Sequence, residues 1–260
     1  MVKFFVEAAS LALIFSLEGL FPLFKGRQAR LKHGLKNLSI GVLNGLAVSF
    51  LFSSLIVWAL AWSEARSFGL LRLLSLNAAM ETALAFLLFD LWMYGWHRAN
   101  HAVPFLWRFH RMHHSDIELD STSALRFHLG EILLSSALRL AVLPLLGLKL
   151  IHLFIYEICL QPVILFHHSN AALPEKWDRV FRALIVTPNM HRVHHSIESS
   201  ETNSNYSSVF SFWDRLVQTF RKREDARSLE YGLPYFREPE WQSVAGMLKT
   251  PFVNPVMAPK

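Results

Sequence analysis

The residues of this chain best able to do chemistry are histidines in the pattern His-Arg-x-His-His-Ser, which occurs at 110–115 and again at 191–196. With 13 histidines in 260 residues, two copies that also share Arg and Ser are improbable by chance. The histidines of the two copies are His110, His113, His114, His191, His194 and His195. On a helix, positions i, i+3 and i+4 share one face, so each copy is expected to project three imidazoles into one small volume. Because neutral imidazole is the commonest metal ligand in proteins, the pattern predicts binding of metal, as more than one ion.

Another pair, His97 and His101, is spaced by about one helical turn at the end of an apolar run. A helix that continues out of this run would hold both side chains at the membrane edge. Asp90 and Tyr94 lie on the same helical stripe, and an acid inside a membrane needs a partner. Two interpretations remain open for this stripe: it orients a ligand imidazole through its second ring nitrogen, or it makes a hydrogen bond that packs helices together.

Further histidines lie outside these motifs. His128 occurs in the segment RFHLGE, and Glu131 would share its helical face. His167 and His168 end the last apolar run, and adjacent helical residues point about 100° apart, so only one of the two is expected to reach a shared site. The two remaining histidines, which are expected not to bind metal, are His33 and His152.

The three principal motifs contain eight histidines, which exceed the needs of one tetrahedral zinc ion and suffice for two ions. A site made of nitrogen ligands suits iron, zinc or copper, and ligand type alone does not choose among them. The single cysteine, Cys159, lies inside an apolar run. Cysteine usage therefore excludes a disulfide framework, cysteine-based zinc ribbons and cysteine-ligated iron–sulfur clusters.

The elements that position these histidines are apolar. Hydrophobic residues make up 52% of the chain and the mean hydropathy is +0.28, more than in a typical soluble domain. A membrane span needs roughly 20 apolar residues, and the runs that qualify are 4–24, 38–62, 76–96, 132–148 and 151–166. The last two are short enough to form either a full or a shallower hairpin. The sequence predicts an all-α integral membrane protein of four to five transmembrane helices, with a single catalytic domain over residues 1–260.

Two histidine-rich segments, 97–130 and 167–220, are expected to form a helical cap that carries a two-metal site, followed by a C-terminal tail at 221–260. The loop at 25–36 holds five basic residues and no acid, which predicts that it is cytoplasmic. The order of the spans then puts all the histidine motifs on the cytoplasmic face, in a bacterial inner membrane or the endoplasmic reticulum. The net charge of +6 indicates attraction to anionic lipid rather than nucleic acid, because the basic residues flank the spans.

The motifs resemble those of a known family. HRANH at 97–101, HRMHH at 110–114 and HRVHH at 191–195 are similar to the three histidine boxes of the sterol desaturase / fatty acid hydroxylase superfamily. RFHLGE at 126–131, HSN at 168–170 and the stretch at 205–220 resemble further segments of that family, so the likeness covers about residues 85–220. The chain departs from the family pattern in having Leu129 for the usual Pro, and Val217-Gln218 for Phe-Gly.

The resemblance implies a membrane enzyme of four or five spans with a non-haem di-iron centre. Such enzymes use O2 to hydroxylate or desaturate an unactivated C–H bond of a lipid, here a sterol, a fatty acyl chain or a related molecule. The ligands that it implies are His97, His101, His110, His113, His114, His128, His168, His191, His194 and His195. The residues expected to support those ligands are Asp90, Tyr94, Glu131 and Asn170. Two iron ions are expected as cofactors, and zinc can substitute for them on purification.

The chain contains no cysteines of the ferredoxin type and no G-x-G-x-x-G motif. The expected partners are therefore the membrane lipid and a separate reductase or electron carrier of ferredoxin or cytochrome b5 type, while the oligomeric state stays open. Two alternatives are a zinc-dependent membrane hydrolase, and a haem- or metal-binding membrane protein without oxygenase activity. The absence of H-E-x-x-H weakens the first. The clustering of histidines at span edges weakens the second, because haem and transport sites place them in mid-span.

Overall fold

The computed structural model describes residues 2–26 and 29–254, and within these ranges the chain is helical, with no extended strand. The α-helices are α1 (Val2–Leu20), α2 (Arg30–Leu51), α3 (Ser53–Ala65), α4 (Ala78–Ala102), α5 (Pro104–His114), α6 (Leu129–Leu146), α7 (Leu150–His168), α8 (Glu175–Phe181), α9 (Pro188–His194), α10 (Ser199–Thr202), α11 (Phe212–Leu216) and α12 (Val244–Lys249). Short 3₁₀ turns are η1 (Leu70–Leu73), η2 (Ser121–Leu125), η3 (Ala226–Ser228) and η4 (Thr250–Phe252). Residues 27 and 28 of the predicted cytoplasmic loop and residues 255–260 of the predicted tail lie outside the described ranges.

Three helices, α2, α6 and α7, are long and apolar enough to cross a membrane, and α3 with η1 and α4 forms a bent pair, at 83°, that qualifies as a fourth span. The structure therefore has three candidate spans, or four if the bent pair counts as one, against the four to five predicted. The predicted span at 4–24 corresponds to α1, which carries Lys3, Glu7 and Glu18. The predicted span at 38–62 is two helices, because α2 begins at Arg30 and the helix is interrupted at Phe52.

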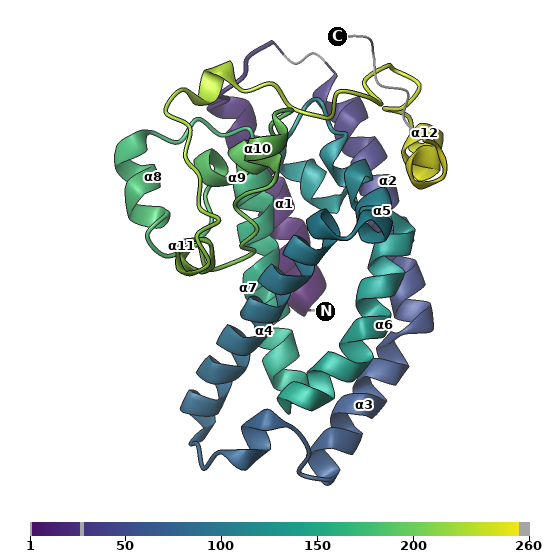
Figure 1. Ribbon diagram of the computed structural model, residues 1–260, viewed down its shortest axis with the longest axis vertical. Helices are drawn as coiled ribbons and strands as arrows, with labels where there is room; N and C mark the ends of the chain where they lie inside the picture. Colours follow the sequence, from purple (N-terminus) through teal and green to yellow (C-terminus); the bar gives the residue numbers. More distant parts are fainter. Residues whose placement is uncertain (1, 27–28, 255–260) are drawn as a thin grey trace.

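Figure 1 shows that the long helices α3, α4, α6 and α7 extend to one end of the molecule, while α8 to α12 gather around the other. The core that the long helices share includes Leu60, Phe89, Leu143 and Tyr156. At the far end, α6 turns into α7 at Gly147, whose φ of 74° favours glycine. The bundle therefore presents one end of α4, α6 and α7 to the histidine-rich segments.

Both His-Arg-x-His-His-Ser motifs lie on short helices that begin with proline. Pro104 starts α5 and Pro188 starts α9, the first helical position, where a missing N–H costs nothing. Each helix also ends where its motif ends, because Ser115 is the C-cap of α5 and His195 is the C-cap of α9. Each motif is thus held on a short helix with fixed ends.

Buried polar contacts join α1 and α2 to the segments that flank the histidines. The carboxylate of Glu18 accepts hydrogen bonds from the backbone N–H groups of Ser121 and Asn170, at 3.0 and 2.8 Å. The ring of His33 lies 2.9 Å from both Asp116 and Asp120. Burial alone would raise the pKa of the Asp116 carboxyl, but His33 and Arg126 bring this pKa well below its usual range. This charged cluster ties α2 to the end of the first motif.

Part of the predicted C-terminal tail packs against the first histidine motif. Met247 of α12 packs in a buried cluster with Ile40 of α2 and Met112 of α5. The Gln242 side chain accepts a hydrogen bond from Arg126 at 3.0 Å and donates one to the Ser115 carbonyl at 2.9 Å. The tail therefore braces the first histidine motif from outside.

Candidate metal centre

Nine histidines converge in two groups. In each group, one ring nitrogen per residue lies within 4.8 Å of the others. The first group is His97, His101, His110, His114 and His194, and the second is His113, His168, His191 and His195. All eight histidines of the three principal sequence motifs are in these groups, and the ninth is His168.

The two copies of the motif divide their histidines between the two groups in opposite ways. From α5, His110 and His114 join the first group and His113 joins the second. From α9 and its cap, His191 and His195 join the second group and His194 joins the first. At about 100° per residue, positions i and i+4 are about 40° apart, whereas i+3 lies on the other side of i. The expectation that each copy sends all three imidazoles into one volume is therefore wrong: each copy sends two to one group and one to the other.

In the first group, three rings are oriented by hydrogen bonds from Nδ1. The ring of His97 donates to the Tyr206 carbonyl at 2.8 Å, and that of His194 donates to the Ser204 carbonyl at 2.6 Å. His110 donates to the Glu131 carboxylate at 2.9 Å. Among the described residues, the buried Nε2 atoms of all five members have no hydrogen-bond partner. Buried nitrogens without partners are costly, and a shared metal ion would satisfy them.

In the second group, Nε2 atoms converge on one another. The Nε2 of His168 lies 3.2 Å from that of His113 and 3.0 Å from that of His191, and His195 lies 3.2 Å from His191. A metal bound at about 2.0–2.1 Å by tetrahedral nitrogen ligands holds them roughly 3.3 Å apart. The His168 ring also donates from Nδ1 to the Ile164 carbonyl at 2.7 Å, so its Nε2 faces the group. The spacing fits a metal ion.

The charge state of the rings also fits metal binding. Burial lowers the pKa of His113, His114 and His195 well below the usual 6.5, and neighbouring imidazoles lower it further. The same holds for His191 and His194. Neutral imidazoles keep a free lone pair, which is the form that binds metal.

The two groups adjoin each other. The ring of His114 stacks on that of His195, with centroids 4.6 Å apart and planes 16° apart. His113 lies beside His195 at the same centroid distance of 4.6 Å. Two ions bound in these groups would therefore be neighbours.

His128, predicted as a ligand, lies outside both groups. Its ring caps the N-terminus of α6, where Nδ1 accepts the Gly130 N–H at 2.9 Å and Nε2 donates to the Leu248 carbonyl at 3.2 Å. Both ring nitrogens are used by the backbone. His167, the neighbour of His168, also lies outside the second group, although its ring is 4.0 Å from that of His191. His33 and His152, expected not to bind metal, lie outside both groups as well.

Of the four residues predicted to support the ligands, only Glu131 contacts one. Asp90 accepts hydrogen bonds from the Tyr156 hydroxyl, the Trp213 indole and the backbone N–H groups of Val209 and Phe210. It therefore anchors the loop that follows Tyr206 and does not touch a histidine ring.

Tyr94 and Asn170 have similar structural roles. The Tyr94 hydroxyl lies 2.9 Å from that of Thr219, and the ring packs against Tyr206. The Asn170 side chain accepts from the N–H of Phe24 and donates to its carbonyl. This contact joins the end of α7 to the connection after α1. The hydrogen bonds of Asp90 and Tyr94 are those of the packing interpretation, and neither is made to an imidazole.

Sequence reasoning missed three groups at the site. The carbonyls of Ser204 and Tyr206 orient two imidazoles, but a carbonyl has no side-chain signature. The Phe127 ring stacks on that of His113, with centroids 4.3 Å apart and planes 11° apart. Its position one residue before His128 was the only available signal.

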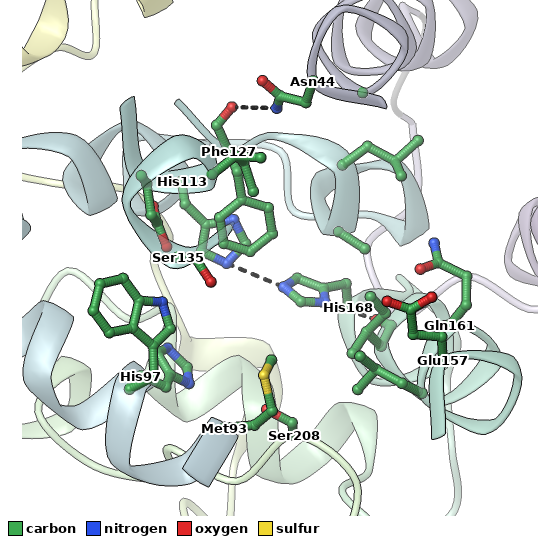
Figure 2. A pocket seen from close by; sticks show the side chains of 18 of the residues that line it. Asn44, Met93, His97, His113, Phe127, Ser135, Glu157, Gln161, His168 and Ser208 are labelled. Atoms are coloured by element: carbon green, nitrogen blue, oxygen red, sulfur yellow. Dashed lines mark hydrogen bonds between the residues drawn. The ribbon is translucent and has the colours of Figure 1, made fainter. Parts of the chain in front are cut away.

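A cavity of about 320 Å³ opens onto the histidines, a size typical of small-molecule sites. Five histidines of the two groups line it, and its other walls come from α1, α2, α4, α6 and α7. Figure 2 shows the rings of His113 and His168 in contact, with their Nε2 atoms 3.2 Å apart, and Glu157 and Gln161 further along the α7 side. The Asn44 amide donates to the Phe127 carbonyl at 2.8 Å. The candidate centre is thus open to a molecule that lies between the long helices.

Three known proteins with similar sequences carry related names. The chain is similar to the ornithine lipid hydroxylase OlsE of Rhizobium tropici, at 32% identity over 156 residues that cover 60% of this chain and 46% of that protein. Alkylglycerol monooxygenase of Homo sapiens is 27% identical over 241 residues, which cover 89% of this chain and 49% of that protein. Cholesterol 25-hydroxylase of Rattus norvegicus is 26% identical over 144 residues, covering 53% and 46%.

The chain spans about half the length of these relatives. No solved structure is significantly similar to it. Residues 82–219, just over half of the chain, match the fatty acid hydroxylase family. This segment runs from α4 to just beyond α11 and contains every histidine of the two groups. The chain therefore belongs to the fatty acid hydroxylase family.

Proposed function

We propose that this chain is an O2-dependent, di-iron hydroxylase that inserts oxygen into an unactivated C–H bond of a membrane lipid. The single observation that carries the proposal is the pair of adjoining histidine groups at the end of a cavity between candidate membrane helices. The named relatives act on ornithine lipid, alkylglycerol and cholesterol, which are all lipids. Their names favour hydroxylation over desaturation.

The nine histidines would hold two iron ions, with five ligands in one group and four in the other. Bound iron supplies the oxidising power for a strong C–H bond, which amino-acid side chains cannot supply. Nitrogen-only ligand sets also accept zinc, so zinc can replace iron during purification.

The chain's own residues orient the site and shield it. Glu131 and the carbonyls of Tyr206 and Ser204 fix three rings of the first group, so that each presents Nε2 inward. Phe127 covers one face of His113, which limits access of water to the second group. The candidate spans beside the cavity give a lipid a route to the site from the bilayer.

The proposal includes a multi-pass chain with the metal centre on the cytoplasmic face. The basic segment 25–36, which includes the first turns of α2, supports this orientation, because Lys and Arg next to the ends of spans stay in the cytoplasm. The one cysteine of the chain, Cys159, cannot by itself hold an iron–sulfur cluster. Electrons are proposed to come from a separate ferredoxin- or cytochrome b5-type carrier.

The function is tested by comparing lipids from cells that express the chain with those from cells that express His113→Ala or His194→Ala, one variant for each group. Mass spectrometry should find a lipid that gains one oxygen atom only with the unaltered chain. A lipid that loses two hydrogens and gains no oxygen would mean that the reaction is desaturation and not hydroxylation. Identical lipids in all samples would overturn the proposal.

A further inference from the structure

The cavity has a second end, away from the histidines, that carries charge. Lys3 and Glu7 of α1, Arg139 of α6 and Glu157 of α7 all line it. The Lys3 amine lies 2.7 Å from one oxygen of Glu157 and 3.8 Å from Glu7. The Arg139 guanidinium lies 3.6 Å from the other Glu157 oxygen. Four charges from three helices therefore meet at one wall of a cavity.

This charged end lies at a fixed distance from the metal centre. Along α7, the cavity-lining residues Glu157, Gln161, Ile164 and His168 form one helical stripe. Eleven residues separate the ends of this stripe, which corresponds to about 16 Å along the helix axis. Along α6, eight residues separate Arg139 from Glu131, about 12 Å from the residue that orients a ligand. A molecule bound at the charged end can therefore reach the histidines with its remaining length.

Arg139 is the member of the cluster with unused hydrogen-bonding capacity. Its nearest carboxylate is 3.6 Å away, too far for a strong hydrogen bond, and one terminal nitrogen contacts only the Met93 sulfur at 3.5 Å. Its buried Nε has no hydrogen-bond partner in the described part of the chain. The guanidinium is held beside the rings of Phe89 and Trp92, 5.6 and 5.7 Å from their centroids. Because Lys3 lies closest to Glu157, the donors of Arg139 remain for another acceptor.

A charged residue within a membrane-crossing helix is costly and marks a functional site by default. Arg139 lies in α6, one of the three helices apolar enough to span. Guanidinium groups bind phosphate and carboxylate with two parallel hydrogen bonds, which an ammonium group cannot do. The side chains around Arg139 do not supply such a pair of oxygen atoms at hydrogen-bond distance from its guanidinium.

We propose that Arg139 binds the phosphate or carboxylate oxygens of the lipid substrate's head group, so that the C–H bond to be oxidised lies about 12–16 Å away along the cavity. This inference rests on the proposed function, because it makes the cavity the substrate site. It assigns the substrate to amphiphilic lipids with an anionic or zwitterionic head group, and it makes Arg139 a specificity-determining residue.

The structure offers a matched control. At the far end of the bundle, Glu81 pairs with Arg72 at 2.7 Å and with Lys149 at 3.0 Å. This cluster has the same composition as Glu157 with Arg139 and Lys3, but none of its members lines the cavity. Arg72→Gln therefore disturbs an equivalent ion-pair network without touching the proposed substrate site.

The test measures binding of dodecyl phosphate and dodecanol, which differ only in head group, to the purified protein in detergent without O2 or an electron donor. The unaltered chain should bind dodecyl phosphate about tenfold more tightly than dodecanol. Arg139→Gln should abolish this preference and Arg72→Gln should retain it. Arg139→Lys keeps the charge and should retain only part of the preference for dodecyl phosphate. This variant also provides the test if Arg139→Gln does not fold.

Equal preference in Arg139→Gln and Arg72→Gln, or no preference in the unaltered chain, would overturn the inference. Displacement of dodecyl phosphate by an equal concentration of inorganic phosphate would also overturn it, because the site would then bind the free ion and not the lipid. Since the measurement needs neither metal nor O2, its outcome is independent of whether the chain proves to be an oxygenase.

Discussion

The imidazole rings of His114 and His195 stack 4.6 Å apart, although one belongs to the first histidine group and the other to the second. They are the last histidines of the two motif copies, so the stack brings the ends of α5 and α9 together. This contact makes the two candidate metal sites neighbours, and it accounts for a motif that occurs twice: each copy supplies ligands to both sites.

Removing the His114 ring and removing the His195 ring should lower the metal content by different amounts. His195→Ala leaves three ligands in the second group, whereas His114→Ala leaves four in the first. We expect His195→Ala to lose the metal of its group and His114→Ala to retain more. Metal analysis of the purified variants checks this order, and full retention of two ions by both would refute the ligand assignment.

Glu131→Gln should weaken metal binding without removing a ligand. The carboxylate accepts from His110 and also lies 3.3 Å from the Asn100 amide. Loss of a partner that orients a metal-bound histidine typically costs about 10–100-fold in affinity. Chelator competition measures the change, with Glu64→Gln in α3 as the control. Equal affinities for the two variants would show that Glu131 has no part in orienting His110.

Asp90→Asn should destabilise the loop that carries Tyr206. The buried carboxylate accepts from four donors, and an amide would place its own N–H against some of them. An unsatisfied buried donor costs about 1–3 kcal/mol. Thermal unfolding in detergent should show a lower Tm together with weaker metal retention. An unchanged Tm would mean that the loop does not depend on this anchor.

His128→Asn should keep both the fold and the metal. Asparagine is a favoured N-cap residue, so it can replace the ring nitrogen that accepts from Gly130. His128→Ala should lose about 0.5–2 kcal/mol of stability through the missing cap, again with full metal content. Loss of metal in the Asn variant would return His128 to the ligand set.

The sequence predicted most of the candidate site, because histidine spacing on helices is a strong signal. The periodicity placed His97 beside His101 on the same face of α4, and the order of the apolar runs brought both motif copies to the same side of the membrane. It did not predict how each copy divides, since the division depends on the rotation of α5 and α9 against each other. It could not predict the carbonyl partners of His97 and His194, which belong to the backbone of a loop.

The errors have physical causes. Asp90 lies on the predicted stripe, but that part of α4 faces α7 and the loop before α11, so it binds Tyr156 and Val209 instead of an imidazole. His128 precedes α6 by one residue, a position where a side chain caps the helix. The uncharged run at 38–62 predicts one span, but the chain interrupts its helix at Phe52.

The most direct test of the account is the metal content of the purified chain, measured together with O2 consumption in the presence of a lipid extract and an electron donor. The account predicts close to two irons per chain, and O2 uptake matched by formation of hydroxylated lipid. Haem absorption, or a single zinc ion with no O2 uptake, would contradict it.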